Sequence, residues 1–193
     1  VKELVTSVDY DPTNKRIAFT GKESGNLYLC IQKVNTSNNT ITDLDWGNVV
    51  TSTGSVYDSS VSYMSVENRF CVVYQNSGLK ARLTNDVTTS GVSFGSALGI
   101  AGSGSSGQGH IATCYDKDLD RVVVVNENDD ASGAGYFRII NITSTSNNTI
   151  AASQASNFGG TNVKWLDVAY NPMTKKSVVM YSDDAGTDLK SRA

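Results

Sequence analysis

The stretch VDYDPTNKRIAF, residues 8–19, decides the fold, because its pattern returns three more times along the chain. In every copy an extended segment ends in a tyrosine, a five-residue polar turn follows, and a basic residue opens a second apolar segment. An extended segment, a short turn and a β-branched segment predict a β-hairpin in each copy. The tyrosines are Tyr10, Tyr63, Tyr115 and Tyr170, spaced 53, 52 and 55 residues apart, and the basic residues are Arg16, Arg69, Arg121 and Lys176.

Each copy continues beyond the hairpin with a polar, glycine-containing loop and a third apolar segment, and the first three copies add a fourth. The turns NTSNNTIT from Asn35 and STSNNTIA from Ser144 are nearly identical and lie 109 residues apart, close to two periods. The third segments are LYLCIQKV (27–34), LKARL (79–83), YFRIINI (136–142) and LKSRA (189–193), and the fourth are TITDLDW (40–46), GVSFGSA (91–97) and TIAASQA (149–155).

Four antiparallel strands in a repeat of about 50 residues predict an all-β, β-propeller-like fold, in which each repeat is one blade. The predicted blades are residues 1–54, 55–104 and 105–160, with an incomplete fourth blade at 161–193. The missing fourth strand favours a chain that is part of a larger propeller, because an open sheet edge invites pairing. A β-sandwich or β-solenoid with repeats is the alternative, but a sandwich would not keep so regular a register over four units, and a solenoid usually has shorter coils.

Composition excludes several classes of function. A net charge of -3, with scattered Lys and Arg, argues against nucleic-acid binding. No apolar run approaches the roughly 18 residues of a membrane-spanning helix, so no membrane insertion is expected. Each of Cys30, Cys71 and Cys114 falls in a predicted strand, which indicates small buried hydrophobes rather than a disulfide framework.

No pattern of residues predicts a catalytic or metal site. The single histidine, His110, has no serine nucleophile motif beside it and is expected to be structural. The glycine-rich run 99–110 lacks the Lys-Ser/Thr pair of a phosphate-binding loop and is interpreted as a connection between blades. Asp116–Asp120 spaces three carboxylates like the start of a calcium loop, but without the glycine and the distal glutamate. We therefore predict no metal and no cofactor.

The loops between the second and third strands are the candidate binding surface, because they gather on one rim of a propeller and loops on a rigid scaffold carry function. These rim loops are Gly21–Asn26, Gln75–Gly78, Glu127–Gly135 and Ser182–Thr187, with Lys22, Glu23, Asn76, Asn128, Asp129, Asp130, Asp183 and Asp184 as candidate binding residues. Trp46 and Trp165 could stack on a sugar, but their strand positions favour packing in the core. Turn chemistry explains the four Asn-x-Ser/Thr sequons without glycosylation.

The unit carried by VDYDPTNKRIAF and VAYNPMTKKSVVMY resembles a repeat of marine bacteriophage tail-fibre and virion structural proteins, and the pattern covers essentially the whole chain. The second and third copies depart from it because they lack the proline. The resemblance implies a non-enzymatic virion appendage for attachment to the host surface. Its expected partners are other virion proteins and a host receptor, with a glycan as one option, and a homo-oligomer is expected.

The alternative is an extracellular lectin or glycan-active enzyme on the same scaffold. Such an enzyme needs paired carboxylates that converge on the central channel. Asp129, Asp130, Asp183 and Asp184 are the candidates that the sequence offers for that pair.

Overall fold

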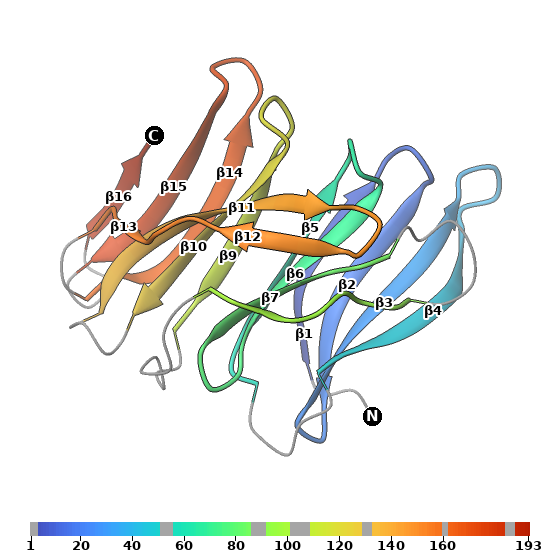
Figure 1. Cartoon of the computed structure of the whole chain (residues 1–193). Helices are drawn as coiled ribbons and strands as arrows, with labels where there is room; N and C mark the ends of the chain where they lie inside the picture. The colour runs from blue at the N-terminus through green and yellow to red at the C-terminus, as the bar shows by residue number, and fades with distance from the viewer. Residues whose placement is uncertain are drawn as a thin grey trace.

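The computed structural model of the protein describes residues 4–50, 56–85, 92–100, 109–128, 133–159, 162–183 and 188–193. These residues form four antiparallel sheets, one for each repeat (Figure 1). The first contains β1 (Leu4–Asp11), β2 (Arg16–Glu23), β3 (Asn26–Asn35) and β4 (Thr40–Val50), and the second β5 (Ser59–Met64), β6 (Arg69–Gln75), β7 (Leu79–Leu83) and β8 (Leu98–Gly99). The third contains β9 (Ile111–Asp116), β10 (Arg121–Asn128), β11 (Ala134–Ser144), β12 (Thr149–Ala152) and β13 (Ser156–Asn157), and the fourth β14 (Lys164–Asn171), β15 (Lys176–Asp183) and β16 (Asp188–Arg192).

The sheets are arranged as the blades of a propeller. The first strands of successive sheets pack side by side, β1 on β5, β5 on β9 and β9 on β14, and are the inner strands. The remaining strands of each sheet follow outward in chain order, except that β13 pairs with β11, and the fourth sheet has three strands among the described residues (Figure 1). The prediction of an all-β, propeller-like fold is confirmed. The limits of the four blades and the expected larger propeller stay predictions.

The outermost strands differ from the prediction. In the second sheet the described segment 92–100 pairs through an isolated bridge from Thr84 to Phe94 and through the short β8 rather than as one strand over 92–97, and residue 91 of the predicted strand lies outside the described residues. Val92 and Phe94 instead pack against the core between the first two sheets. In the third sheet the predicted segment 149–155 ends as β12 at Ala152, and β13 then pairs with β11. At the edge of the second sheet, the packing of Val92 and Phe94 thus takes the place of a continuous ladder.

The turn between the first and second strands repeats one geometry. The residue that precedes each basic residue has a positive φ between 49° and 54°, at Lys15, Asn68, Asp120 and Lys175. The carboxylate of Asp11 accepts hydrogen bonds from the N–H groups of Thr13 and Asn14, both at 3.0 Å. Asp116 and Asn171 do the same in their own turns. The carboxylate of Asp116 is thus part of the hydrogen bonding of the turn itself.

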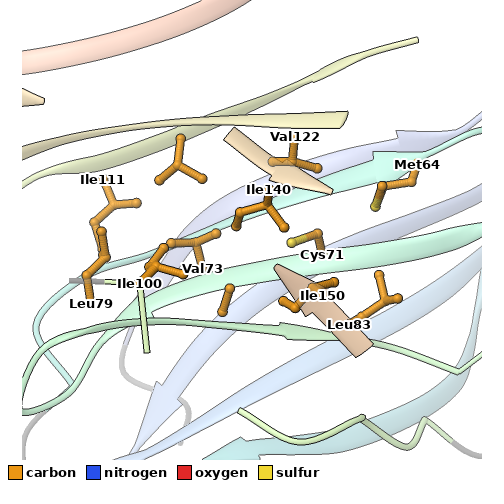
Figure 2. Close-up of a cluster of buried hydrophobic side chains, with 12 residues drawn as sticks. Met64, Cys71, Val73, Leu79, Leu83, Ile100, Ile111, Val122, Ile140 and Ile150 are labelled. Carbon is orange, nitrogen blue, oxygen red and sulfur yellow. The ribbon is translucent and has the colours of Figure 1, made fainter. Parts of the chain in front are cut away.

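The core lies between the sheets, because each blade has two apolar faces that only its neighbours cover. Figure 2 shows the cluster between the second and third sheets, where Met64, Cys71 and Leu83 meet Val122, Ile140 and Ile150. Cys30 and Cys71 are buried and Cys114 is half-buried, all as free thiols, as predicted. The described residues include no helix long and apolar enough to cross a membrane.

Candidate functional site

One end of the inner strands gathers aromatic and charged side chains. The strands β5, β9 and β14 begin at this end, and the second strands β2 and β10 finish there, because hairpin partners run antiparallel. We call this surface the inner rim and define it by Lys22, Tyr57, Asp58, His110, Glu127, Lys164 and Trp165.

Trp165 is the most exposed large side chain of the inner rim. Its backbone lies in an irregularity of the β14–β15 ladder between Lys164 and Asp167, with a φ of 47°, which bulky residues rarely adopt. A bulge of this kind re-aims a side chain away from the sheet. The indole ring is consequently 72% exposed, and its centroid lies 4.8 Å from that of the His110 ring at an angle of 31°. The expectation that Trp165 packs in the core is wrong.

Asp58 supplies a carboxyl group next to this aromatic pair. One oxygen accepts a hydrogen bond from the N–H of Ile111 across the sheet boundary, and the other accepts one from the N–H of Ser59, both at 2.8 Å. Burial is the largest influence on the pKa of Asp58 and raises it above its ordinary value. The two hydrogen bonds and the charges of His110 and Lys22 act in the opposite direction and are outweighed.

Two lysines fix the positions of the surrounding chain. Lys22 Nζ donates hydrogen bonds to the carbonyl oxygens of Val56, at 2.9 Å, and Tyr57, and so ties β2 to the segment that leads into β5. Lys164 Nζ forms an ion pair with the buried carboxylate of Glu127. Tyr57 is left partly exposed. The described residues contain no group of three or more potential metal ligands.

The structure brings only part of the predicted binding set to this surface. Lys22 and Glu23 finish β2, and Lys22 reaches the inner rim. Asn76 is buried, its backbone N–H donates to the carbonyl of Gly78 at 3.0 Å, and its side-chain Nδ2 has no hydrogen-bond partner among the described residues. Asn128 and Asp183 end β10 and β15, but their side chains lie outside what the structure describes, and Asp129, Asp130 and Asp184 lie outside the described residues altogether.

Sequence reasoning missed Asp58, Tyr57 and Lys164 and treated His110 as structural. A signal was available, because Asp58, His110 and Trp165 each stand five residues before a repeat tyrosine. Equivalent positions of neighbouring blades meet at one end of the inner strands. Trp46 lies on β4 and packs edge-on to Phe19, with ring centroids 5.9 Å apart, but it is 38% exposed, so the expectation of core packing fails for this residue too.

A comparison with models of protein families found no match, and a comparison with curated protein sequences found none either. Among solved structures, the chain is similar to an engineered GH43 glycoside hydrolase with endo-xylanase and exo-arabinofuranosidase activity, at a TM-score of 0.51 and 12% identity. That match covers 91% of this chain and 34% of the enzyme, so the chain spans about a third of the enzyme's length. The catalytic domain of the GH62 α-L-arabinofuranosidase of Coprinopsis cinerea also matches, over 98% of this chain and 68% of that domain, with 14% identity. Its TM-score of 0.48 supports no conclusion.

These comparisons correct the functional prediction. The prediction of a non-enzymatic virion appendage for host attachment is wrong, because the protein whose fold the chain shares is a glycoside hydrolase. The predicted alternative, a lectin or glycan-active enzyme on a propeller scaffold, agrees better with that finding. The resemblance to phage repeats and the expectations about receptor, oligomer and location stay predictions. What the comparison shows directly is the shared propeller-like fold.

Proposed function

We propose that the chain is part of a glycan-active enzyme that binds a sugar on the inner rim. The observation that carries this proposal is the exposed Trp165 ring, stacked on His110 beside the carboxyl group of Asp58. An aromatic ring offers a rigid apolar face with little conformational entropy to lose, which suits the C–H face of a sugar ring. The bulge that aims Trp165 outward costs backbone energy, and such strain is often stored at functional sites.

Asp58 is the proposed proton donor to the leaving oxygen of the glycosidic bond. Glycoside hydrolysis uses one carboxylic acid whose pKa is raised, so that it is protonated when the substrate binds. Burial raises the pKa of Asp58 in this direction. If the protonated form is the active one, kcat falls as the pH rises through the pKa of Asp58.

Xylan with and without arabinose substituents is the first substrate to test, because the similar GH43 enzyme acts on this kind of glycan. Binding is measured by calorimetry and hydrolysis by the release of reducing sugar. We expect Trp165→Ala to weaken binding by about tenfold, since one aromatic contact contributes on the order of 1 kcal/mol. Trp46→Ala is the control, because Trp46 packs on β4 away from the inner rim.

Asp58→Asn separates catalysis from binding. We expect it to lower kcat by about 10²–10⁴-fold while KM changes little, as for the loss of a general acid. Full activity in Asp58→Asn would exclude Asp58 as the acid, and unchanged binding in Trp165→Ala would exclude the inner rim as the sugar site. Binding that depends on Trp165 without any hydrolysis would instead identify a lectin. That second candidate is favoured by one observation: the other described carboxyl group of the inner rim, Glu127, is held in an ion pair with Lys164, whereas hydrolysis needs a second carboxyl group beside Asp58.

A further inference from the structure

Three of the four repeats place an arginine at the same site in the third strand. Arg82, Arg138 and Arg192 pair across the ladder with Val72, Val124 and Val179, and each of these valines stands nine residues after a repeat tyrosine. The equivalent residue of the first repeat is Cys30. The three arginines are therefore internal controls for one another.

Two of the arginines join their sheet to the preceding one. Arg82 donates a hydrogen bond to the carbonyl of Val49 in the first sheet and another, at 2.9 Å, to Gly95. Arg192 donates to the carbonyl of Phe158, next to β13 of the third sheet, at 2.6 Å. In both cases the guanidinium donates to a backbone carbonyl of the preceding sheet.

Arg138 lacks that partner. Its side chain points toward the second sheet, on the same face of β11 as the buried Ile140, but its one hydrogen bond runs within its own sheet, from Nη1 to Asn126 Oδ1 at 2.6 Å. The Tyr136 ring lies below the guanidinium, with the centroid 5.9 Å away. No acidic side chain of the described residues forms an ion pair with Arg138, although the residue is only 7% exposed.

Arg138 lines a cavity of about 340 Å³, whereas Arg82 and Arg192 contact a backbone carbonyl of the preceding sheet. Leu98, Gly99 and Ile100 of the second sheet's edge line one side, and Arg138 and the segment from Ala152 to Ala155 line the other. Ser153 Oγ is already engaged, since it accepts from the N–H of Ile139 and donates to the carbonyl of Gln154, both at 3.0 Å. The Gln154 side chain is exposed and lies at the same cavity.

Arg138 offers further donors to the cavity. An arginine has five N–H donors, of which one is used here, and the donors that remain are open to the cavity rather than sealed in the core. Burial lowers the pKa of Arg138. The cavity is far larger than the roughly 30 Å³ that one water fills, and it reaches the lower end of the range for small-molecule sites.

We propose that the cavity between the second and third sheets binds a small oxyanion, which completes the coordination of Arg138 and bridges the two blades. A carboxylate or sulfate group matches the fork of N–H donors that the guanidinium presents. The size of the cavity admits an organic acid such as a sugar acid, and a free inorganic oxyanion carries the same chemistry. The site lies on the outer half of the sheets, so it is independent of the function proposed for the inner rim.

The test uses thermal unfolding of the whole chain with sodium glucuronate, with sodium sulfate, and with glucose as the uncharged control, at constant ionic strength. A ligand at a hundred times its Kd raises Tm by about 5–10 °C in a chain of this size. We expect glucuronate, sulfate or both to stabilise the protein and glucose to have no effect. Glucuronate alone would identify a sugar acid as the source, and sulfate alone an inorganic oxyanion.

Arg138→Met removes the charge and keeps the length of the side chain, so it is expected to abolish the anion-dependent rise in Tm. Arg82→Met is the matched control and should keep that rise, because Arg82 is satisfied by protein carbonyls. If Arg138→Met fails to fold, Gln154→Ala takes its place and should weaken anion binding several-fold. The proposal is overturned if no anion stabilises the protein beyond the glucose control, or if the stabilisation survives in Arg138→Met or is unchanged in Gln154→Ala.

Discussion

At the scale of single residues, the strongest polar contact is the buried pair of Asp11 and Arg16 in the first turn. Arg16 donates to Asp11 Oδ2 from Nε at 2.8 Å and from Nη2 at 2.5 Å, and both residues are almost fully buried. Burial alone would raise the pKa of Asp11, but the hydrogen bonds from Asn14 and Arg16 hold it below its ordinary value. A charged pair of this kind is costly to break, because removing one partner leaves the other buried and unpaired.

Asp11→Asn is expected to lower the free energy of unfolding by about 3–5 kcal/mol at neutral pH, since Arg16 then lacks its counter-charge. The lowered pKa sets the sign of the pH dependence. The stability from Asp11 is present above its unfolded pKa of about 3.9 and is lost as the pH falls through the lower folded value. The measurement is urea unfolding at pH 7 and at several acidic pH values. The free energy of unfolding of the wild type is expected to exceed that of Asp11→Asn at pH 7, and this difference is expected to shrink toward low pH.

Asp116→Asn is the matched control, because Arg121 in that pair is more exposed than Arg16 and its loss should cost less. Burial raises the pKa of the nearby Asp9, so the contribution of Asp9 to the free energy of unfolding changes with pH in the opposite direction. Asp9 is present in both proteins, so the difference in the free energy of unfolding between wild type and variant isolates the contribution of Asp11. A gap that stays constant with pH would contradict the role assigned to the charge of Asp11.

At the scale of elements, the repeated turn before each second strand requires one left-handed residue. Lysine occupies this position in the first and fourth copies, with φ of 54° at both Lys15 and Lys175. Asparagine and aspartate, which tolerate this region better, occupy it in the second and third copies. Asn68 and Asp120 also accept a hydrogen bond from the hydroxyl of the repeat tyrosine, at 3.0 Å from Tyr63 and 2.6 Å from Tyr115.

Lys175→Gly is expected to raise the free energy of unfolding by about 0.5–1 kcal/mol. The left-handed conformation costs a side-chain-bearing residue about 1–2 kcal/mol, and this gain exceeds the extra backbone entropy that glycine loses on folding. Asp120→Gly is the comparison and should not stabilise, because it also deletes the hydrogen bond from Tyr115. Equal stabilisation by both substitutions, measured by urea unfolding, would show that the tyrosine contact contributes nothing.

At the scale of the whole molecule, the apolar cores that stabilise the fold lie between neighbouring sheets. Phe70 is fully buried between the first and second sheets, with its ring centroid 5.1 Å from that of Tyr63. Because each blade covers its neighbour, the loss of one interface exposes apolar surface on two sheets at once. We therefore expect the blades to unfold together.

Phe70→Ala is expected to cost about 3–5 kcal/mol, through lost burial and the cavity left behind. Val66→Ala, at an exposed position in the turn that follows β5, should change little. Tryptophan fluorescence reads both ends of the molecule, since Trp46 belongs to the first sheet and Trp165 to the fourth. With one tryptophan at a time replaced by phenylalanine, coincident urea transitions are expected from the two probes. Separate transitions, with only the Trp46 signal moved by Phe70→Ala, would contradict a cooperative array of blades.

The sequence by itself determined the repeat, the order of the strands and the turn chemistry. These properties are local, because strand periodicity, the residues of a five-residue turn and the position of a left-handed residue follow from neighbours along the chain. The tyrosine–turn–basic pattern therefore located all four hairpins and predicted the propeller-like fold. The strand positions also predicted the burial of Cys30 and Cys71, whereas Cys114 is only half-buried.

Only the tertiary structure decided which side chains meet. Asp58, His110 and Trp165 lie more than 50 residues apart, and their contact arises because three inner strands begin side by side. The bulge that turns Trp165 outward depends on the pairing of β14 with β15, which the strand pattern does not encode. Likewise, the repeat makes three arginines equivalent in sequence: Arg82, Arg138 and Arg192. Only the fit of each sheet against the preceding one leaves Arg138 beside a cavity. The sequence pattern does not predict this difference, because packing between blades depends on two surfaces rather than on one segment.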